Sequence, residues 1–201
     1  MLITGIKSRP VYDRLQPMAG GLRHLIVGQG SGGAAMLRLI GEMSPAQRQA
    51  STLLYSTESF SGHNHLTELR QTEADDLLVF DSNHALIEGL RRLLESAHMG
   101  TRLYLSGSES FIGTAMQAAN AVDLNRDEVL REHSGTLVRR VWCAHCDTYT
   151  ENVTQRVFTC PGCQLNLVVR DHYSRRLAAF QGIKADGEVP GELPPAEELD
   201  T

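Results

Sequence analysis

The sequence has no long apolar run, few aromatic residues and no cysteine outside one short segment. Aromatic side chains make up 5% of its 201 residues, and there is a single tryptophan. No apolar run approaches the roughly 20 residues that a membrane-spanning helix needs, which argues against an integral membrane protein. Residues 1–7 lack a basic start followed by an apolar stretch, so no secretory signal is visible and we expect a cytoplasmic protein.

The sequence also lacks the excess of positive charge that is typical of nucleic-acid-binding proteins. Lys and Arg number 19 against 24 Asp and Glu, which gives a formal net charge of −5. Proteins that bind nucleic acid through its phosphates usually present a basic patch or stripe. The composition therefore argues against nucleic acid as a partner.

Alternating strand and helix patterns predict an α/β domain between residues 22 and 135. Apolar runs of strand length occur at residues 25–27, 51–55, 76–80 and 103–105. Helical patterns occur at residues 34–42, 86–97 and 111–122. This alternation predicts a parallel sheet with helices on both faces, as in nucleotide-binding domains.

Four further segments flank this domain. Residues 1–21, which include two prolines, predict an extended N-terminal arm, and residues 136–171 show β-type patterning around the cysteines. Residues 172–185 predict a C-terminal helix. Residues 186–201 are rich in Pro, Gly and Glu, which predicts an acidic flexible tail, disordered or draped on a partner.

The cysteines give the strongest chemical signal. Cys143, Cys146, Cys160 and Cys163 form two Cys-x-x-Cys pairs separated by 13 residues. In a chain without an export signal, such pairs favour a metal site over two disulfides. Backbone amides of each short turn can point at the sulfurs, and two turns complete the four-sulfur cage of a zinc ribbon. This favours one structural Zn²⁺ per chain, with iron as the alternative; His145 could replace a cysteine or simply be exposed.

A glycine-rich turn after the first predicted strand is the second candidate site. Gly28, Gly30 and Gly33 match the dinucleotide fingerprint Gly-x-Gly-x-x-Gly between a strand and a helix. With Ser31 and Gly32, they would let a pyrophosphate approach the helix N-terminus. Structural glycines in a tight strand-to-helix turn would give the same pattern.

Three weaker candidates each have a simpler structural explanation. Glu58 could bind a ribose hydroxyl or be a solvated loop carboxylate. His63 and His65 could ligate a metal, but no third ligand is close in sequence. Residues 81–84 follow the third predicted strand at the ligand-binding edge of the sheet, yet Asp81 or Ser82 there is more simply a helix N-cap.

Two short segments resemble the nucleotide domain of ferredoxin reductases. Residues 103–111 (Leu-Tyr-Leu-Ser-Gly-Ser-Glu-Ser-Phe) resemble its Cys-Gly-Pro-Glu turn, and the segment from Gly30 to Leu37 resembles its Gly-x-Gly-x-x-Pro-Met-Leu motif. The resemblance implies NAD(P)H as a cofactor, with Ser106 and Gly107 beside the nicotinamide. Ser106 replaces the family's cysteine and Ala35 its proline. Because only 21 residues precede the first predicted strand, we expect no flavin barrel in this chain.

A second resemblance is carried by four segments, which are residues 6–12 (Ile-Lys-Ser-Arg-Pro-Val-Tyr), 139–146 (Arg-Arg-Val-Trp-Cys-Ala-His-Cys), 169–180 and 190–194. Together they resemble the DmmA-type subunit of bacterial dimethylamine monooxygenase. The resemblance implies a noncatalytic or accessory subunit in a complex that oxidatively demethylates methylated amines with electrons from NAD(P)H. Its implied partners are a haem oxygenase subunit and a flavin/iron–sulfur reductase subunit.

The C-terminal arginines are candidates for contact with a partner, and two hypotheses for the function of the chain remain. Arg170, Arg175 and Arg176 would form a cationic end suited to carboxylates of a partner protein, or would pair with the chain's own acidic tail. The first hypothesis is an accessory subunit that organises the catalytic subunits. The alternative is an active redox component that binds NAD(P)H at the glycine-rich turn or iron in the four-cysteine site.

Overall fold

The computed structural model describes residues 8–72, 76–195 and 197–199, which form two compact units. Tyr12–Thr136 form the α/β domain, whereas residues 8–11 join the described residues from Leu137 onward in the C-terminal domain. The arm expected at residues 1–21 is therefore divided between the two domains at residue 11. Its residues 1–7 lie outside the described part.

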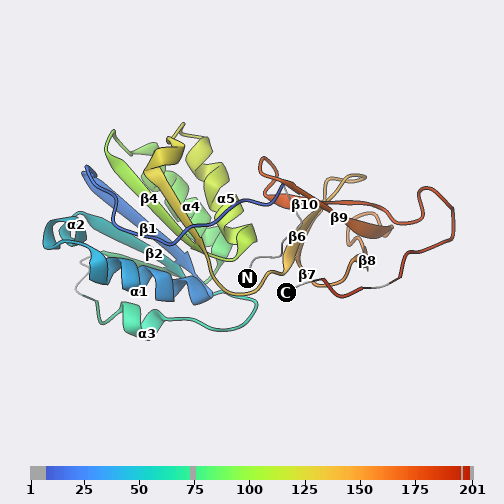
Figure 1. Cartoon of the computed structure of the whole chain (residues 1–201), viewed down its shortest axis with the longest axis horizontal. Helices are drawn as coiled ribbons and strands as arrows, with labels where there is room; N and C mark the ends of the chain where they lie inside the picture. Colours follow the sequence, from blue (N-terminus) through green and yellow to red (C-terminus); the bar gives the residue numbers. More distant parts are fainter. Residues whose placement is uncertain (1–7, 73–75, 196, 200–201) are drawn as a thin grey trace. The chain divides into compact units, whose positions relative to one another are not determined.

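The α/β domain is built on a parallel sheet, as the sequence predicts (Figure 1), and this sheet has five strands. Its strands are β1 (Arg23–Gln29), β2 (Ser51–Ser56), β3 (Leu77–Phe80), β4 (Thr101–Gly107) and β5 (Val129–His133). They lie in the order β3-β2-β1-β4-β5, and each neighbouring pair is parallel. The order reverses at β1, so the crevice between the carboxyl ends of β1 and β4 is the usual ligand position in such folds.

Helices cover both faces of this sheet. They are α1 (Gly33–Glu42), α2 (Pro45–Gln49), α3 (Leu66–Leu69), α4 (Asn83–Glu95) and α5 (Glu109–Asn120), with 3₁₀ turns at Gly30–Gly32 and Arg126–Glu128. Because successive strand residues point to opposite faces, Leu25 and Val27 pack in the core with α4 and α5, whereas Ile26 packs with α1 and α3. The sequence patterns did not predict α2, α3 or β5.

The C-terminal domain is a second five-stranded sheet. Its strands are β6 (Arg139–Cys143), β7 (Tyr149–Val153), β8 (Val157–Thr159), β9 (Asn166–Ser174) and β10 (Ala179–Lys184). They lie in the order β7-β6-β10-β9-β8, in which β10 is parallel to β6 and antiparallel to β9. The late strand β10 therefore joins two hairpins into one sheet.

The helix expected at residues 172–185 is wrong. These residues complete β9, turn, and form β10, where Tyr173 pairs with Phe180 and their rings lie 5.2 Å apart. The turn depends on Ala178, which has a φ of +51°, and on Ser174, whose hydroxyl accepts a hydrogen bond from the Leu177 N–H. Pairing with distant strands outweighs the weak local helical pattern.

Residues 197–199 of the expected flexible tail pack on their own domain, which corrects that expectation for this part of the tail. Leu199 is 5% exposed and belongs to the core of the C-terminal sheet. Its N–H donates to the Thr154 carbonyl, and the Arg156 N–H donates to the Glu197 carbonyl. The Arg156 and Glu197 side chains also form an ion pair of 2.9 Å. An apolar residue at position 199 thus anchors the acidic segment.

Candidate functional site

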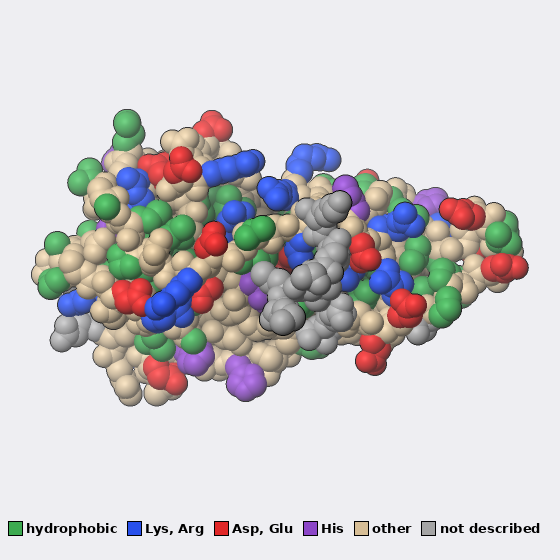
Figure 2. Space-filling model, in the orientation of Figure 1, with side chains coloured by type: hydrophobic (Ala, Val, Ile, Leu, Met, Phe, Trp, Pro, Cys, Tyr) green, Lys and Arg blue, Asp and Glu red, His purple; other side chains and the backbone are tan. Residues whose placement is uncertain are grey.

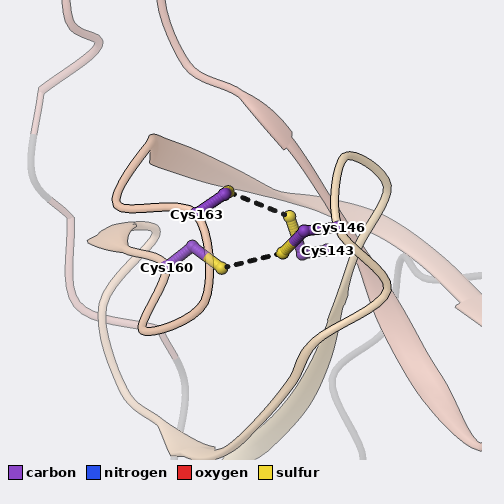
Figure 3. Close-up of side chains that lie close together, drawn as sticks. All are labelled: Cys143, Cys146, Cys160 and Cys163. Carbon is purple, nitrogen blue, oxygen red and sulfur yellow. Dashed lines mark hydrogen bonds between the residues drawn. The ribbon is translucent and has the colours of Figure 1, made fainter.

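The four cysteines converge in the C-terminal domain (Figure 3). Cys143 ends β6 and Cys146 follows it, while Cys160 and Cys163 lie in the connection between β8 and β9. All four sulfurs lie within 4.8 Å of one another. Across the described residues, no other group of three or more His, Cys, Asp or Glu side chains could hold a metal ion.

The sulfur spacing fits a single tetrahedral ion. At a metal–sulfur distance of about 2.3 Å, two ligands of a regular tetrahedron lie about 3.8 Å apart. The Cys143–Cys163 and Cys146–Cys160 sulfur pairs are 3.8 and 3.7 Å apart. Separations of about 2 Å would indicate disulfides, and all four thiols are free. The donor set and its geometry thus fit zinc, and equally iron.

The two cysteine turns have the same backbone geometry. In each turn, the N–H of the first cysteine donates to the carbonyl five residues later at 2.9 Å, and its carbonyl accepts an N–H from four residues later at 3.0 Å. The partners are Thr148 and Asp147 for Cys143, and Leu165 and Gln164 for Cys160. The residue after the second cysteine is left-handed in both turns, with a φ of +60°. Each pair of sulfurs is thus positioned by the hydrogen bonds of its own turn.

The thiols differ in their surroundings. Hydrogen bonds from the Thr148 hydroxyl, 3.2 Å away, and from the Thr148 N–H lower the pKa of Cys146 to about 6. Burial raises the pKa of Cys143 to about 12, although the N–H groups of His145 and Cys146 oppose this. A bound cation would favour the thiolate form of all four.

Gly162 allows the two turns to approach each other. A β-carbon at Gly162 would lie 2.2 Å from Thr148 Oγ1 and 3.0 Å from Cys146 Sγ. His145, at the equivalent position of the first turn, is exposed. Thr148 and Gly162 are therefore part of the site, although neither was a candidate from the sequence. The only available signal was a hydroxyl residue two positions after Cys146.

The residues predicted for nucleotide binding lie together at the carboxyl edge of the parallel sheet. Gly28 is near the end of β1, Ser31 lies between Gly30 and Gly32 in the 3₁₀ turn, and Gly33 begins α1. Ser106 and Gly107 end β4.

The end of β4 is in direct contact with the turn. The Ser106 hydroxyl donates to the Gly32 carbonyl at 3.0 Å. A β-carbon at Gly32 would lie 2.4 Å from the Ser106 carbonyl oxygen. Close approach of β4 therefore requires glycine at position 32.

Residues 57–65, which follow β2, also contact the turn. Gly30 has a φ of +52°, and a β-carbon there would lie 2.3 Å from Ser59 Cβ. The Tyr55 hydroxyl donates to the Gly30 carbonyl at 2.6 Å and accepts the His65 N–H at 2.8 Å. The glycines of the turn are thus packed against the chain itself.

Gln29 links three segments at this edge, and it was not a candidate from the sequence. Its side-chain amide donates to the Glu58 carbonyl at 2.7 Å and accepts the Ser108 N–H at 3.1 Å. Gln29 is 5% exposed. Its side chain therefore connects β1 to the segments that follow β2 and β4.

The weaker candidates take structural positions. The Glu58 carboxylate accepts the Asn83 N–H at the start of α4, at 2.6 Å, and the Ser82 hydroxyl caps the same helix. His63 is exposed, and His65 Nδ1 lies 3.7 Å from Glu68. Neither histidine belongs to a metal-ligand group of the described residues.

The charged residues of the C-terminal domain do not form the cationic helix end that was expected. Arg175 and Arg176 are exposed in the turn between β9 and β10, whereas Arg139 is 3% exposed. Arg139 pairs with Asp171 at 2.9 Å and lies 4.6 Å from the ring centroid of Phe180. On the face drawn in Figure 2, basic and acidic side chains are interspersed.

Among the described helices, none is long and apolar enough to cross a membrane.

Solved structures show only a distant similarity. An intact type IV self-sufficient cytochrome P450 monooxygenase aligns over 86% of this chain and 21% of its own, with a TM-score of 0.46 and 16% identity. The flavohaem-like FAD/NAD-binding domain of nitric oxide dioxygenase from Vibrio cholerae aligns over 63% and 56%, with a TM-score of 0.44 and 17% identity. These scores are too low to indicate a ligand or an activity for this chain.

Sequence comparisons are more specific. The "heme-dependent oxidative N-demethylase delta subunit" of Ectopseudomonas mendocina (strain ymp) is 37% identical over 101 residues, which cover 50% of this chain and 58% of that protein. The N-terminal domain of the family described as "dimethylamine monooxygenase subunit DmmA-like" matches residues 4–129, and its C-terminal domain matches residues 140–183. The chain therefore belongs to the dimethylamine monooxygenase subunit DmmA-like family.

Proposed function

We propose that this chain is a noncatalytic accessory subunit of an oxidative N-demethylase complex that acts on methylated amines. Its C-terminal domain would be held together by one structural Zn²⁺ bound to Cys143, Cys146, Cys160 and Cys163. The observation that carries the proposal is the convergence of four sulfurs at one point. Four thiolates fill every position of a tetrahedral ion, so no position is left for substrate or oxygen.

Family membership supports a role inside a larger assembly. The relative in E. mendocina is named as a subunit of a haem-dependent oxidative N-demethylase. The partners proposed for this chain are a haem oxygenase subunit and a flavin/iron–sulfur reductase subunit that takes electrons from NAD(P)H in the cytoplasm. The exposed side chains of Arg170 and Arg175 are suited to carboxylates on such partners.

The proposed work of the subunit is assembly of the complex. A closed thiolate site that holds two turns of a small β domain contributes folding energy and fixes the surface around it. That surface includes the tips of both cysteine turns, where Ala144, His145 and Pro161 are exposed. Binding of a partner to this surface would require the metal, because the metal holds the surface in shape, although the metal itself would take part in no reaction.

The test is reconstitution of the complex with and without this subunit. The isolated chain should be colourless and should neither oxidise NAD(P)H nor demethylate dimethylamine. Omitting it, or replacing it with Cys146→Ser, should reduce co-elution of the partner subunits and the demethylation rate together. Gly41→Ala is the control, because a β-carbon at this position of the α/β domain meets nothing within 4 Å. Full assembly and activity without the subunit would contradict an accessory role, and NAD(P)H oxidation by the chain alone would indicate an active redox component.

A further inference from the structure

We infer that the glycine-rich turn of the α/β domain is closed by the chain's own residues and binds no nicotinamide dinucleotide. Gln29 and residues 57–65 take the space above the turn that a dinucleotide would need. The inference goes beyond the proposed function, and it is independent of the metal because every residue concerned belongs to the α/β domain.

The position that a pyrophosphate would take is occupied by residues of this chain. In a dinucleotide-binding turn, the second glycine leaves room for the phosphates to approach the backbone. Here the corresponding space at Gly30 holds the Ser59 side chain, 2.3 Å from the β-carbon position, and the His63 carbonyl oxygen, 3.1 Å from it. The Ser59 hydroxyl donates to that carbonyl. A carbonyl oxygen is an acceptor, so it would repel a phosphate oxygen rather than bind it.

The helix N-terminus is covered in the same way. A pyrophosphate needs the free N–H groups at the start of α1. A β-carbon at Gly33, the first residue of α1, would lie 2.6 Å from His65 Cβ. His65 is held there because its N–H donates to the Tyr55 hydroxyl, which in turn donates to the Gly30 carbonyl. The fully buried Tyr55 thus fixes residues 57–65 against the turn.

The Gln29 side chain lies against the end of β4, where a β-carbon at Gly107 would be 2.9 Å from Gln29 Oε1. Its amide satisfies the Ser108 N–H and the Glu58 carbonyl, two backbone groups that a ligand in this crevice could otherwise contact. The Glu58 carboxylate is bound to the Asn83 N–H and so points to α4 rather than to a ribose. A dinucleotide would have to break these hydrogen bonds and displace residues 57–65.

The first test measures binding of NADH and NADPH to the full chain, by equilibrium dialysis and by nicotinamide fluorescence up to about 1 mM, where a 10 µM site would be nearly full. We compare Ala34→Glu with Ala34→Gln. Ala34 is exposed in the first turn of α1, where a carboxylate favours the helix but repels a pyrophosphate.

The expected result is no saturable binding to any of the three proteins. Saturable binding that is equal in all three would lie elsewhere on the chain and would also support the closed turn. The inference would be overturned if the unmodified chain binds NADH or NADPH and Ala34→Glu weakens this binding tenfold or more while Ala34→Gln does not.

Hydrogen–deuterium exchange tests the closure directly. The His65 and Ser108 N–H groups should be protected in the unmodified chain, and Gln29→Ala should speed exchange at Ser108 and across residues 57–65. Gly41→Ala is the control, because a β-carbon there meets nothing within 4 Å. Exchange at His65 as fast as in an unfolded peptide, or protection of residues 57–65 that increases on adding NADH, would show that the space is open.

Discussion

Gly162→Ala should weaken metal binding although position 162 is not a ligand. The new β-carbon would lie 2.2 Å from Thr148 Oγ1 and 3.0 Å from Cys146 Sγ. Thr148 could rotate away, in which case Cys146 loses its hydrogen bond from the hydroxyl. Otherwise the two cysteine turns must separate, and the four-sulfur cage is distorted. Both responses act on the metal rather than on the rest of the fold.

The expected loss of metal affinity is similar for either response. Loss of a hydrogen bond to a metal ligand typically reduces metal affinity by about 10–100-fold. Overpacking of one methyl group costs about 1–3 kcal/mol, which corresponds to roughly 5–150-fold in affinity. We therefore expect zinc to bind Gly162→Ala about 10–100 times more weakly than it binds the unmodified chain.

The assay is competition for zinc against a chromophoric chelator at fixed pH. Thr148→Val removes the hydroxyl without the clash and should also weaken binding, whereas Thr148→Ser should largely retain it. His145→Ala changes the equivalent but exposed position of the other turn and should have no effect. Equal zinc affinity in Gly162→Ala and the unmodified chain would refute the argument that this close approach shapes the site.

Three further predictions concern stability. Removing the metal with a chelator, or replacing Cys163 with Ser, should unfold the C-terminal domain while the α/β domain keeps its protection from proteolysis; simultaneous loss of both domains would contradict this. Arg139→Met should destabilise the C-terminal domain by about 1–2 kcal/mol in urea unfolding, because it removes the guanidinium over the Phe180 ring and the ion pair with Asp171, whose side chain is 47% exposed; a change below about 0.5 kcal/mol would refute it. Burial, and then Arg102, lower the pKa of His24 below its ordinary value of 6.5. As the pH falls, the unfolded state therefore takes up a proton on His24 before the folded state does. The free energy of unfolding of the α/β domain should decrease below about pH 6.5, by up to about 1.4 kcal/mol per pH unit, and His24→Gln should reduce this pH dependence. The same pH dependence in His24→Gln and the unmodified chain would contradict the prediction.

Features set by local pattern could be predicted from the sequence. The strand and helix alternation predicted the parallel sheet, because buried strands such as residues 25–27 are nearly continuous apolar runs. The cysteine spacing predicted the convergence of the sulfurs, because each pair is positioned by its own turn. Each strand and each cysteine turn depends on residues that are close in the chain.

Features set by contacts between distant segments could not be predicted. The helix expected at residues 172–185 is a pair of strands because Phe180 packs between β6 and β9. Gly30 matches a nucleotide fingerprint, yet its neighbour is Ser59, from residues 57–65. Similarly, the contact of Gly162 with Thr148 appears only once the two cysteine turns face each other. None of these contacts leaves a periodic signal in the sequence.

The most direct test of the account is elemental analysis of the anaerobically purified chain, with an absorption spectrum of the same sample. A structural site predicts one zinc per chain and no visible absorption band. It also predicts that Cys146→Ser loses the zinc and His145→Ala retains it. Iron with charge-transfer bands in the visible range would contradict the account, because the four sulfurs would then hold a redox centre.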